Sequence, residues 1–149
     1  MLKFEFLFNL SADVGELISL GPCPLGERRV VYIGTGTFEG PDLRGELIGG
    51  ADWQILRSDC VLELDARYAI KDHRGGVIQV LSQGLRHGPP EVMARLARGE
   101  DVDPESYFFR TVMRFETGAS ELAWLNKTIA VATARRKARR VELEASRLL

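Results

Sequence analysis

The chain has 149 residues, of which 45% are hydrophobic and 28% are charged. That length fits one domain with a substantial core, so we expect a single domain spanning residues 1–149. A formal charge of −1 and a pI near 6.1 provide no general attraction to nucleic acid or anionic lipid, and they favour small or neutral partners.

The two cysteines, Cys23 and Cys60, stand far apart, with no second pair and no histidine at ligand spacing. This argues against a zinc site and predicts free thiols in a reducing compartment. Glu5, Asn9 and Asp13 interrupt the apolar N-terminal segment, so it does not read as a signal peptide, and no apolar run is of bilayer length. We therefore expect a cytoplasmic protein that binds neither membrane nor nucleic acid.

Segments with strand periodicity recur along the chain, separated by clusters of glycine, proline and aspartate. In the first, Phe4, Phe6, Phe8 and Leu10 are predicted to share one side, and Glu5, Leu7 and Asn9 the other. The predicted strands cover residues 4–10, 27–34, 43–48, 52–58, 61–71, 77–83, 107–116, 123–132 and 141–148.

One helix interrupts this pattern near residues 89–98. Proline opens it, Gly99 closes it, and Val92, Met93 and Leu96 share a face. Because an open sheet of so many strands would leave two exposed edges, we predict a closed barrel. The expected fold is mainly β: a single antiparallel barrel of about eight to ten short strands, with the helix over one mouth.

Strand parity sorts the charged residues but does not decide which face is inside. One face of the segment 61–71 carries Glu63, Asp65 and Arg67, and one face of the segment 107–116 is charged in the same way. These faces either meet solvent as ordinary cross-strand ion pairs or line a polar interior.

Two carboxylates attract attention as candidate proton carriers. Glu39 lies between Phe38 and a glycine, and Asp52 follows two glycines and an alanine directly before Trp53. Small neighbours would let a ligand approach the backbone, and aromatic walls would raise the pKa of either carboxyl toward neutrality. The alternative for Asp52 is a turn-capping role.

Arg86 and His87 lie where a strand gives way to the helix. His87 is a candidate general acid or base and Arg86 a candidate anchor for an anionic or carbonyl oxygen, although a histidine beside prolines is often an ordinary loop residue. The basic run Arg135–Arg140 could hold a phosphate or RNA, but we favour a solvated hairpin tip because the rest of the chain is neutral.

Several catalytic templates do not match. The sequence has no nucleophile elbow, no glycine-rich loop that opens a helix after a strand, and no histidines at metal-ligand spacing. We therefore expect no metal and no cofactor, which leaves cofactor-free proton transfer or plain binding.

Short motifs spread over nearly the whole chain carry a family resemblance. They are Gly36–Pro41, Arg44–Glu46, Gly49–Trp53, Leu64–Tyr68, Arg86–Glu91, Tyr107–Arg110, Phe115–Gly118 and Trp124–Asn126. Together they resemble the family called domain of unknown function 3237. The resemblance implies a small antiparallel β-barrel and no particular reaction. The motif positions that it marks for testing are Glu39, Asp52, Trp53, Asp65, Arg67, Arg86, Glu116, Trp124 and Asn126. The basic run near the end departs from the family pattern.

The leading functional hypothesis is a barrel that holds a small carbonyl-bearing or aromatic molecule and acts as an isomerase, cyclase or lyase by carboxylate proton transfer. The candidate catalytic residues are Asp52, Glu39, Arg86 and His87. The candidate ligand-binding residues are Trp53, Asp65, Arg67, Tyr68, Arg110, Phe115, Glu116, Trp124 and Asn126. The alternatives are a non-catalytic binding module and a structural oligomer joined through the edge of the aromatic first strand, and we expect a homo-oligomer in any case.

Overall fold

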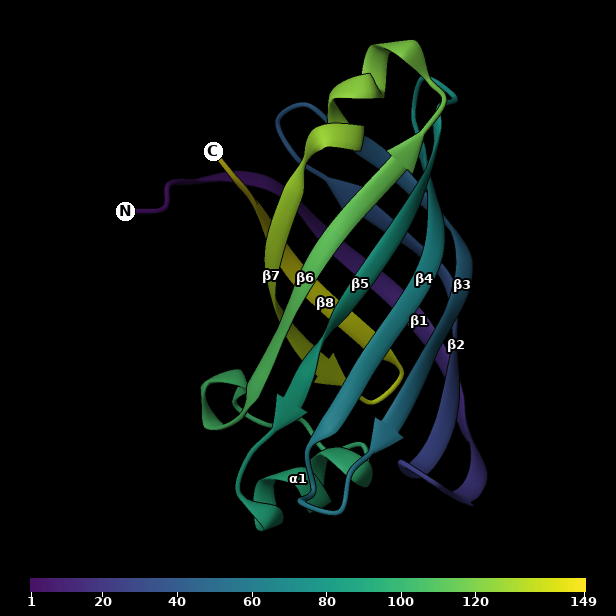
Figure 1. Ribbon diagram of the computed structural model, residues 1–149, viewed down its shortest axis with the longest axis vertical. Helices are drawn as coiled ribbons and strands as arrows, with labels where there is room; N and C mark the ends of the chain where they lie inside the picture. Colours follow the sequence, from purple (N-terminus) through teal and green to yellow (C-terminus); the bar gives the residue numbers. More distant parts are fainter.

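A computed structural model describes all 149 residues. Eight strands wind in chain order into one closed antiparallel barrel (Figure 1). The strands are β1 (Phe4–Cys23), β2 (Gly26–Glu39), β3 (Arg44–Leu56), β4 (Leu62–Asp72), β5 (Val77–His87), β6 (Phe108–Thr117), β7 (Ile129–Lys137) and β8 (Arg140–Leu148). The prediction of a mainly β, closed antiparallel barrel is confirmed, at the lower end of the predicted strand number.

Closure gives the first strand a neighbour on each side. β1 pairs with β8 over Phe4–Asp13 and with β2 over Asn9–Cys23, so its middle residues have backbone partners on both sides. A bulge between Phe6 and Phe8 breaks the predicted alternation. As a result Leu7 and Phe8 are both buried, whereas Phe4 and Phe6 are exposed.

The predicted helix is confirmed as α1 (Pro90–Ala97), which starts at a proline and buries Leu96. Gly99 follows it with a φ of +79°, the left-handed conformation in which glycine commonly ends a helix. Two 3₁₀ helices complete the chain: η1 (Pro104–Ser106) and η2 (Ser120–Lys127).

Two predicted boundaries are wrong. The segments 43–48 and 52–58 belong to one strand, β3, because Gly49 forms a bulge with a φ of +125° instead of a turn. The segment predicted as a strand over 123–132 begins inside η2. Leu122 and Leu125 are three residues apart and both fully buried, which is the spacing of a 3₁₀ turn and not of a strand.

The structure also settles which strand faces are internal. Glu63, Asp65 and Arg67 point away from the barrel, and Leu64 and Tyr68 of the same strand are buried inside it. β6 follows the same rule, with Arg110, Arg114 and Glu116 outside and Phe109, Thr111, Met113 and Phe115 inside. The charged faces are therefore the solvent faces.

One end of the barrel is filled by side chains. Phe8 is fully buried, and its ring meets those of Phe38 and Phe115 edge to face at centroid distances of 5.8 and 6.2 Å. Leu122 and Leu125 of η2 close this end, which is uppermost in Figure 1. We call it the packed end.

The opposite end is covered by α1 and the segment after it (Figure 1). Leu96 of α1 packs there with Leu62, Tyr107 and Phe109 in a second and smaller cluster. We call it the polar end, because the polar cavity described below lies between this cluster and the packed end. No helix in the structure combines the length and the apolar character needed to cross a bilayer.

Candidate functional site

A cavity of about 70 Å³ lies inside the polar half of the barrel. Most of its wall is aliphatic or aromatic, and the polar groups come from five strands. They are Asp52, Gln54, Tyr68, Ser82, Arg86, Thr111 and Arg136. Arg86, Arg136 and Gln54 also line a larger groove of about 720 Å³ that runs beneath α1. The two spaces therefore share a wall, with the inner one holding only a small group or a few waters.

Asp52 lies on the inner wall because β3 presents residues 52 and 54 on the same side. Gln54 Nε2 donates to Asp52 Oδ2 at 2.9 Å, and the backbone N–H of Asp65 donates to Asp52 Oδ1 at 2.9 Å. The β3–β4 ladder is interrupted between the Asp52–Ala66 and Ile55–Glu63 pairs. The Asp52 carboxylate of β3 thus accepts the Asp65 N–H of β4 in place of a backbone carbonyl. It does not cap a turn.

Burial raises the pKa of the Asp52 carboxyl above its ordinary value. The hydrogen bonds from Gln54 and from the Asp65 amide, and the positive charge of Arg86, act in the opposite direction but are outweighed. The same burial, together with the nearby Asp52 charge, raises the pKa of the Tyr68 hydroxyl. At neutral pH, protonating Asp52 therefore costs less free energy than protonating an aspartate in water.

Three arginines reach this region from three strands. Arg29 Nη2 donates to Gln54 Oε1 at 2.9 Å, and the Arg86 guanidinium stands over the Phe109 ring at 5.6 Å. Arg136 comes from the basic run, and its backbone N–H donates to the Tyr107 hydroxyl at 3.0 Å. Burial and the like charges of Arg136 and Arg29 lower the pKa of Arg86 to about 10.

Buried polar atoms without hydrogen-bond partners line the cavity and the adjoining groove. They are Arg29 Nε, Tyr68 Oη, Arg86 Nε and Thr111 Oγ1, and a fifth, Asp72 Oδ1, lies at the packed end. Buried polar groups in proteins nearly always have a partner. Four unpartnered groups in one place indicate a site built for a polar ligand or for bound water.

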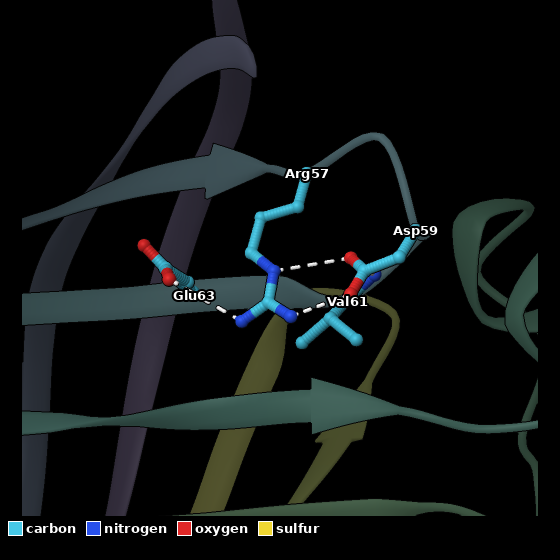
Figure 2. A network of polar contacts seen from close by, with 4 residues as sticks. All are labelled: Arg57, Asp59, Val61 and Glu63. Atoms are coloured by element: carbon cyan, nitrogen blue, oxygen red, sulfur yellow. Dashed lines mark hydrogen bonds and ion pairs between the residues drawn. The ribbon is translucent and has the colours of Figure 1, made fainter. Parts of the chain in front are cut away.

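The rim of the groove is held by the turn between β3 and β4. Figure 2 shows Arg57 Nε donating to Asp59 Oδ1 at 3.0 Å and Arg57 Nη1 donating to Glu63 Oε1 at 3.4 Å. Asp59 Oδ1 also accepts the Val61 N–H at 3.3 Å. The turn carries Cys60, a residue of the groove wall with a φ of +68°.

Of the residues singled out from the sequence, three line the cavity: Asp52, Tyr68 and Arg86. Most of the others lie exposed on the outside of the barrel, away from this cavity: Glu39, Trp53, Asp65, Arg67, His87, Arg110 and Glu116. His87 stacks on Phe108 with ring centroids 4.8 Å apart, and Arg110 stands over the same ring at 5.4 Å.

The remaining three predicted ligand residues lie toward the packed end. Phe115 belongs to its core, and Trp124 lies under the Arg147 guanidinium at 5.2 Å. Asn126 clamps the end of β6, since its Oδ1 accepts the Thr117 N–H at 2.7 Å and its Nδ2 donates to the Thr117 carbonyl at 2.9 Å.

Sequence reasoning missed Gln54, Arg29, Ser82, Thr111 and Arg136 as cavity or groove residues. A period of two counted from Asp52 would have found Gln54. The basic run does form the hairpin tip that we favoured. Its second arginine nevertheless turns inward, and a run of cations gives no sign of which member does so.

The glycines near Asp52 also have a different role from the one expected. A Cβ on Gly50 would lie 2.2 Å from the Arg67 carbonyl oxygen and 2.7 Å from Tyr68 Cβ. Gly50 therefore permits close contact between strands β3 and β4, and no ligand approach is needed to explain it.

Fold and site define a class: small closed β-barrels with an internal polar cavity under a helical cap. The chain belongs to the family described as "Protein of unknown function (DUF3237)", which it matches over residues 2–148. This confirms the family resemblance seen in the motifs.

Bacterial relatives share both sequence and fold. The chain is 38% identical over 149 residues to the UPF0311 protein RPA1785 of Rhodopseudomonas palustris, covering 99% of this chain and 97% of the relative. The crystal structure of RPA1785 superposes with a TM-score of 0.94 at 37% identity, covering 100% and 98% of the two chains. A β-barrel-like protein from Acinetobacter baumannii AYE gives a TM-score of 0.87 at 38% identity over 100% and 97%.

A more distant structure shares the architecture alone. A protein described as an enzyme from Penicillium herquei superposes with a TM-score of 0.76 at 20% identity, covering 99% of this chain and 95% of that one. At that identity the likeness concerns the fold.

Proposed function

We propose that this protein binds a small carbonyl-bearing or aromatic molecule at the polar end and transfers a proton to or from it through Asp52. The reaction would be an isomerase, cyclase or lyase step that needs no cofactor. The observation that carries the proposal is a single carboxyl group with a raised pKa in a cavity whose other polar side chains can all donate hydrogen bonds. A distant structural neighbour described as an enzyme is compatible with it.

The surrounding groups suit this chemistry. A general acid or base works best when its pKa lies near the working pH, and burial moves Asp52 in that direction. Arg86 and the hydroxyls of Tyr68 and Thr111 could stabilise negative charge on a substrate oxygen as the proton moves, because their polar atoms are buried and unpartnered. In this proposal Glu39 and His87, which lie outside, have no part in the chemistry.

A second candidate is a binding module that uses the same cavity without turnover. The observation in its favour is that both carboxylate oxygens of Asp52 already accept a hydrogen bond, one of them from the neighbouring strand. Such a carboxylate has a structural role. The sequence suggested turn capping for Asp52, and the structure shows a bond between strands instead.

The test is a thermal-shift screen of carbonyl and aromatic metabolites with the wild type and with Asp52→Asn. A compound that stabilises both proteins and is converted only by the wild type supports proton transfer by Asp52. Conversion at an unchanged rate by Asp52→Asn contradicts it. A compound that is bound and returned unchanged by the wild type supports the binding module.

A cytoplasmic location and a homo-oligomeric state complete the proposal. The location is supported by two free cysteines, Cys23 and Cys60. Sizing chromatography tests the oligomer, and a monomer at micromolar concentration would contradict it.

A further inference from the structure

We propose that the ligand of this cavity is an organic carboxylate, held at its charged end by Arg86 and Arg136, with its apolar body in the groove under α1. This inference rests on the proposed function, because it names the substrate class of the same site.

Positive charge exceeds negative charge on the wall of the cavity. Arg86 and Arg136 form no ion pair, and the closest carboxylate to Arg29 is Glu27, whose Oε2 is 3.9 Å from Arg29 Nε. Asp52 is the one acidic side chain of the cavity wall. The cavity wall therefore holds two guanidinium groups, Arg86 and Arg136, and one carboxyl group whose pKa is raised by burial. An anion would offset the cost of holding these cations together.

Arg86 lacks a hydrogen-bond partner for its buried Nε. Its side chain packs over Phe109 instead of meeting a carboxylate. The lowered pKa of Arg86 has burial and neighbouring arginines as its causes. A planar guanidinium offers parallel donors that match the two oxygens of a carboxylate better than they match one carbonyl oxygen.

Arg86 and Arg136 lie where the cavity and the groove meet. They are among the few residues that line both the inner cavity and the outer groove. A carboxylate between them would lie at the junction, with Asp52 on the inner side. The groove is about ten times larger than the cavity, 720 against 70 Å³, and its far wall includes Met93, Leu96 and Ala97 of α1. That wall suits the hydrocarbon body of the ligand.

The test compares carboxylates with their uncharged amides. Hexanoate, benzoate and 2-naphthoate would each be paired with the corresponding primary amide, and dissociation constants would be measured near neutral pH by titration calorimetry or by ligand-observed NMR. We expect at least one carboxylate to bind about tenfold or more tightly than its amide, and the difference to shrink in high salt.

Matched variants assign that preference to the proposed residues. Arg86→Gln and, independently, Arg136→Gln should reduce the carboxylate affinity by about tenfold to a hundredfold and reduce the amide affinity much less. Arg114→Gln, which removes an exposed arginine from the outer face of β6, should change neither. Arg86→Lys should fall between the wild type and Arg86→Gln.

The outcomes separate this inference from the proposed function. Equal binding of acids and amides, or an unchanged preference in both glutamine variants, overturns the carboxylate assignment and leaves proton transfer by Asp52 standing. Asp52→Asn should keep or tighten carboxylate binding, since it removes a negative charge beside the anion. If that variant still turns over a substrate, the proposed function fails and the carboxylate site stands.

Discussion

The two ends of this barrel differ in how their interior is filled. At the packed end, Phe8, Phe38 and Phe115 fill the interior, and η2 closes it with two leucines. At the polar end, arginines, amides and hydroxyls converge on a cavity, and several of their atoms have no partner. A barrel of eight strands is narrow enough to be filled by side chains, so an unfilled polar half is a departure that stability alone does not explain. The comparison teaches that one end stabilises the fold and the other is available for a ligand.

Two buried carboxylates make the same contrast. Asp72, at the β4–β5 hairpin of the packed end, has a fully buried side chain whose Oδ2 accepts from both the backbone N–H and Nε of Arg74, at 3.0 and 2.7 Å. Burial acts to raise the pKa of Asp72, but the Arg74 hydrogen bonds outweigh it and the pKa is lowered. At Asp52 burial prevails and the pKa is raised. The Arg74 guanidinium favours the ionised form of Asp72, whereas burial favours the neutral form of Asp52.

The largest expected effect is at the packed end. Phe8→Ala removes a fully buried ring in contact with two others and should lower the free energy of unfolding by about 3–5 kcal/mol. Urea denaturation measures it. Phe108→Ala, at an exposed aromatic of the polar end, is the control and should cost much less. Similar losses for both would break the distinction between the two ends.

The second prediction concerns the contact between β3 and β4. Gly50→Ala places a Cβ within 3 Å of the Arg67 carbonyl and of Tyr68 and should destabilise the protein by about 1–3 kcal/mol. It should also weaken ligand binding, because Asp52 and Tyr68 flank this contact. Gly118→Ala, where a Cβ would meet nothing within 4 Å, should be nearly neutral. Equal denaturation midpoints for the two variants would contradict the assignment.

The third prediction is that a substitution in the polar cavity stabilises the protein, whereas most substitutions of buried residues destabilise it. Arg86→Met removes a buried cation that has no ion pair and keeps an apolar side chain over Phe109. In the absence of ligand we expect the free energy of unfolding to rise by about 1 kcal/mol. Arg114→Met on the outer face should change it by less than about 0.5 kcal/mol. A clear loss of stability in Arg86→Met would mean that Arg86 stabilises the fold.

The smallest effect is a pH dependence of opposite sign at the two carboxylates. The groups facing Asp52 are Gln54, the Asp65 amide and carboxylate, Arg86 and Tyr68, with Arg29 and Arg136 also close enough to feel its charge. Its pKa is raised on folding, so the wild type should lose stability relative to Asp52→Asn as the pH rises from below the ordinary aspartate value through the raised one.

Asp72 should behave in the reverse manner. The groups facing it are Arg74 and His73. Its pKa is lowered, so its contribution is fully present above the ordinary aspartate value and is lost as the pH falls through the lowered one. The difference in stability between the wild type and Asp72→Asn should therefore shrink in acid. Urea denaturation of both variants over a pH series measures the two slopes, and slopes of the same sign would contradict the comparison.

Much of the fold could be predicted because it depends on local signals. Turn residues and alternation identified most strands, and proline and glycine bounded the helix. The failures arose where tertiary packing prevailed over the local signal: Gly49 forms a bulge in a continuous strand, and Leu122 and Leu125 turn a predicted strand into a 3₁₀ plug. Asp52 was found because a carboxylate beside glycines and an aromatic residue is unusual in a strand, and Arg86 was found because it lies where a strand gives way to the helix. Arg136 was not found, because nothing in the sequence distinguishes the one inward-facing arginine from the other cations of the basic run.

The sequence by itself therefore determined the class of fold, the family and the segment in which the acid of the cavity would lie. Only the tertiary structure decided which strand faces are internal, because parity leaves two equivalent choices and barrel closure selects one. It also decided that Arg29, Arg86 and Arg136 meet around Asp52. They come from strands β2, β5 and β7, which are remote in the chain, and their convergence depends on the register of all eight strands.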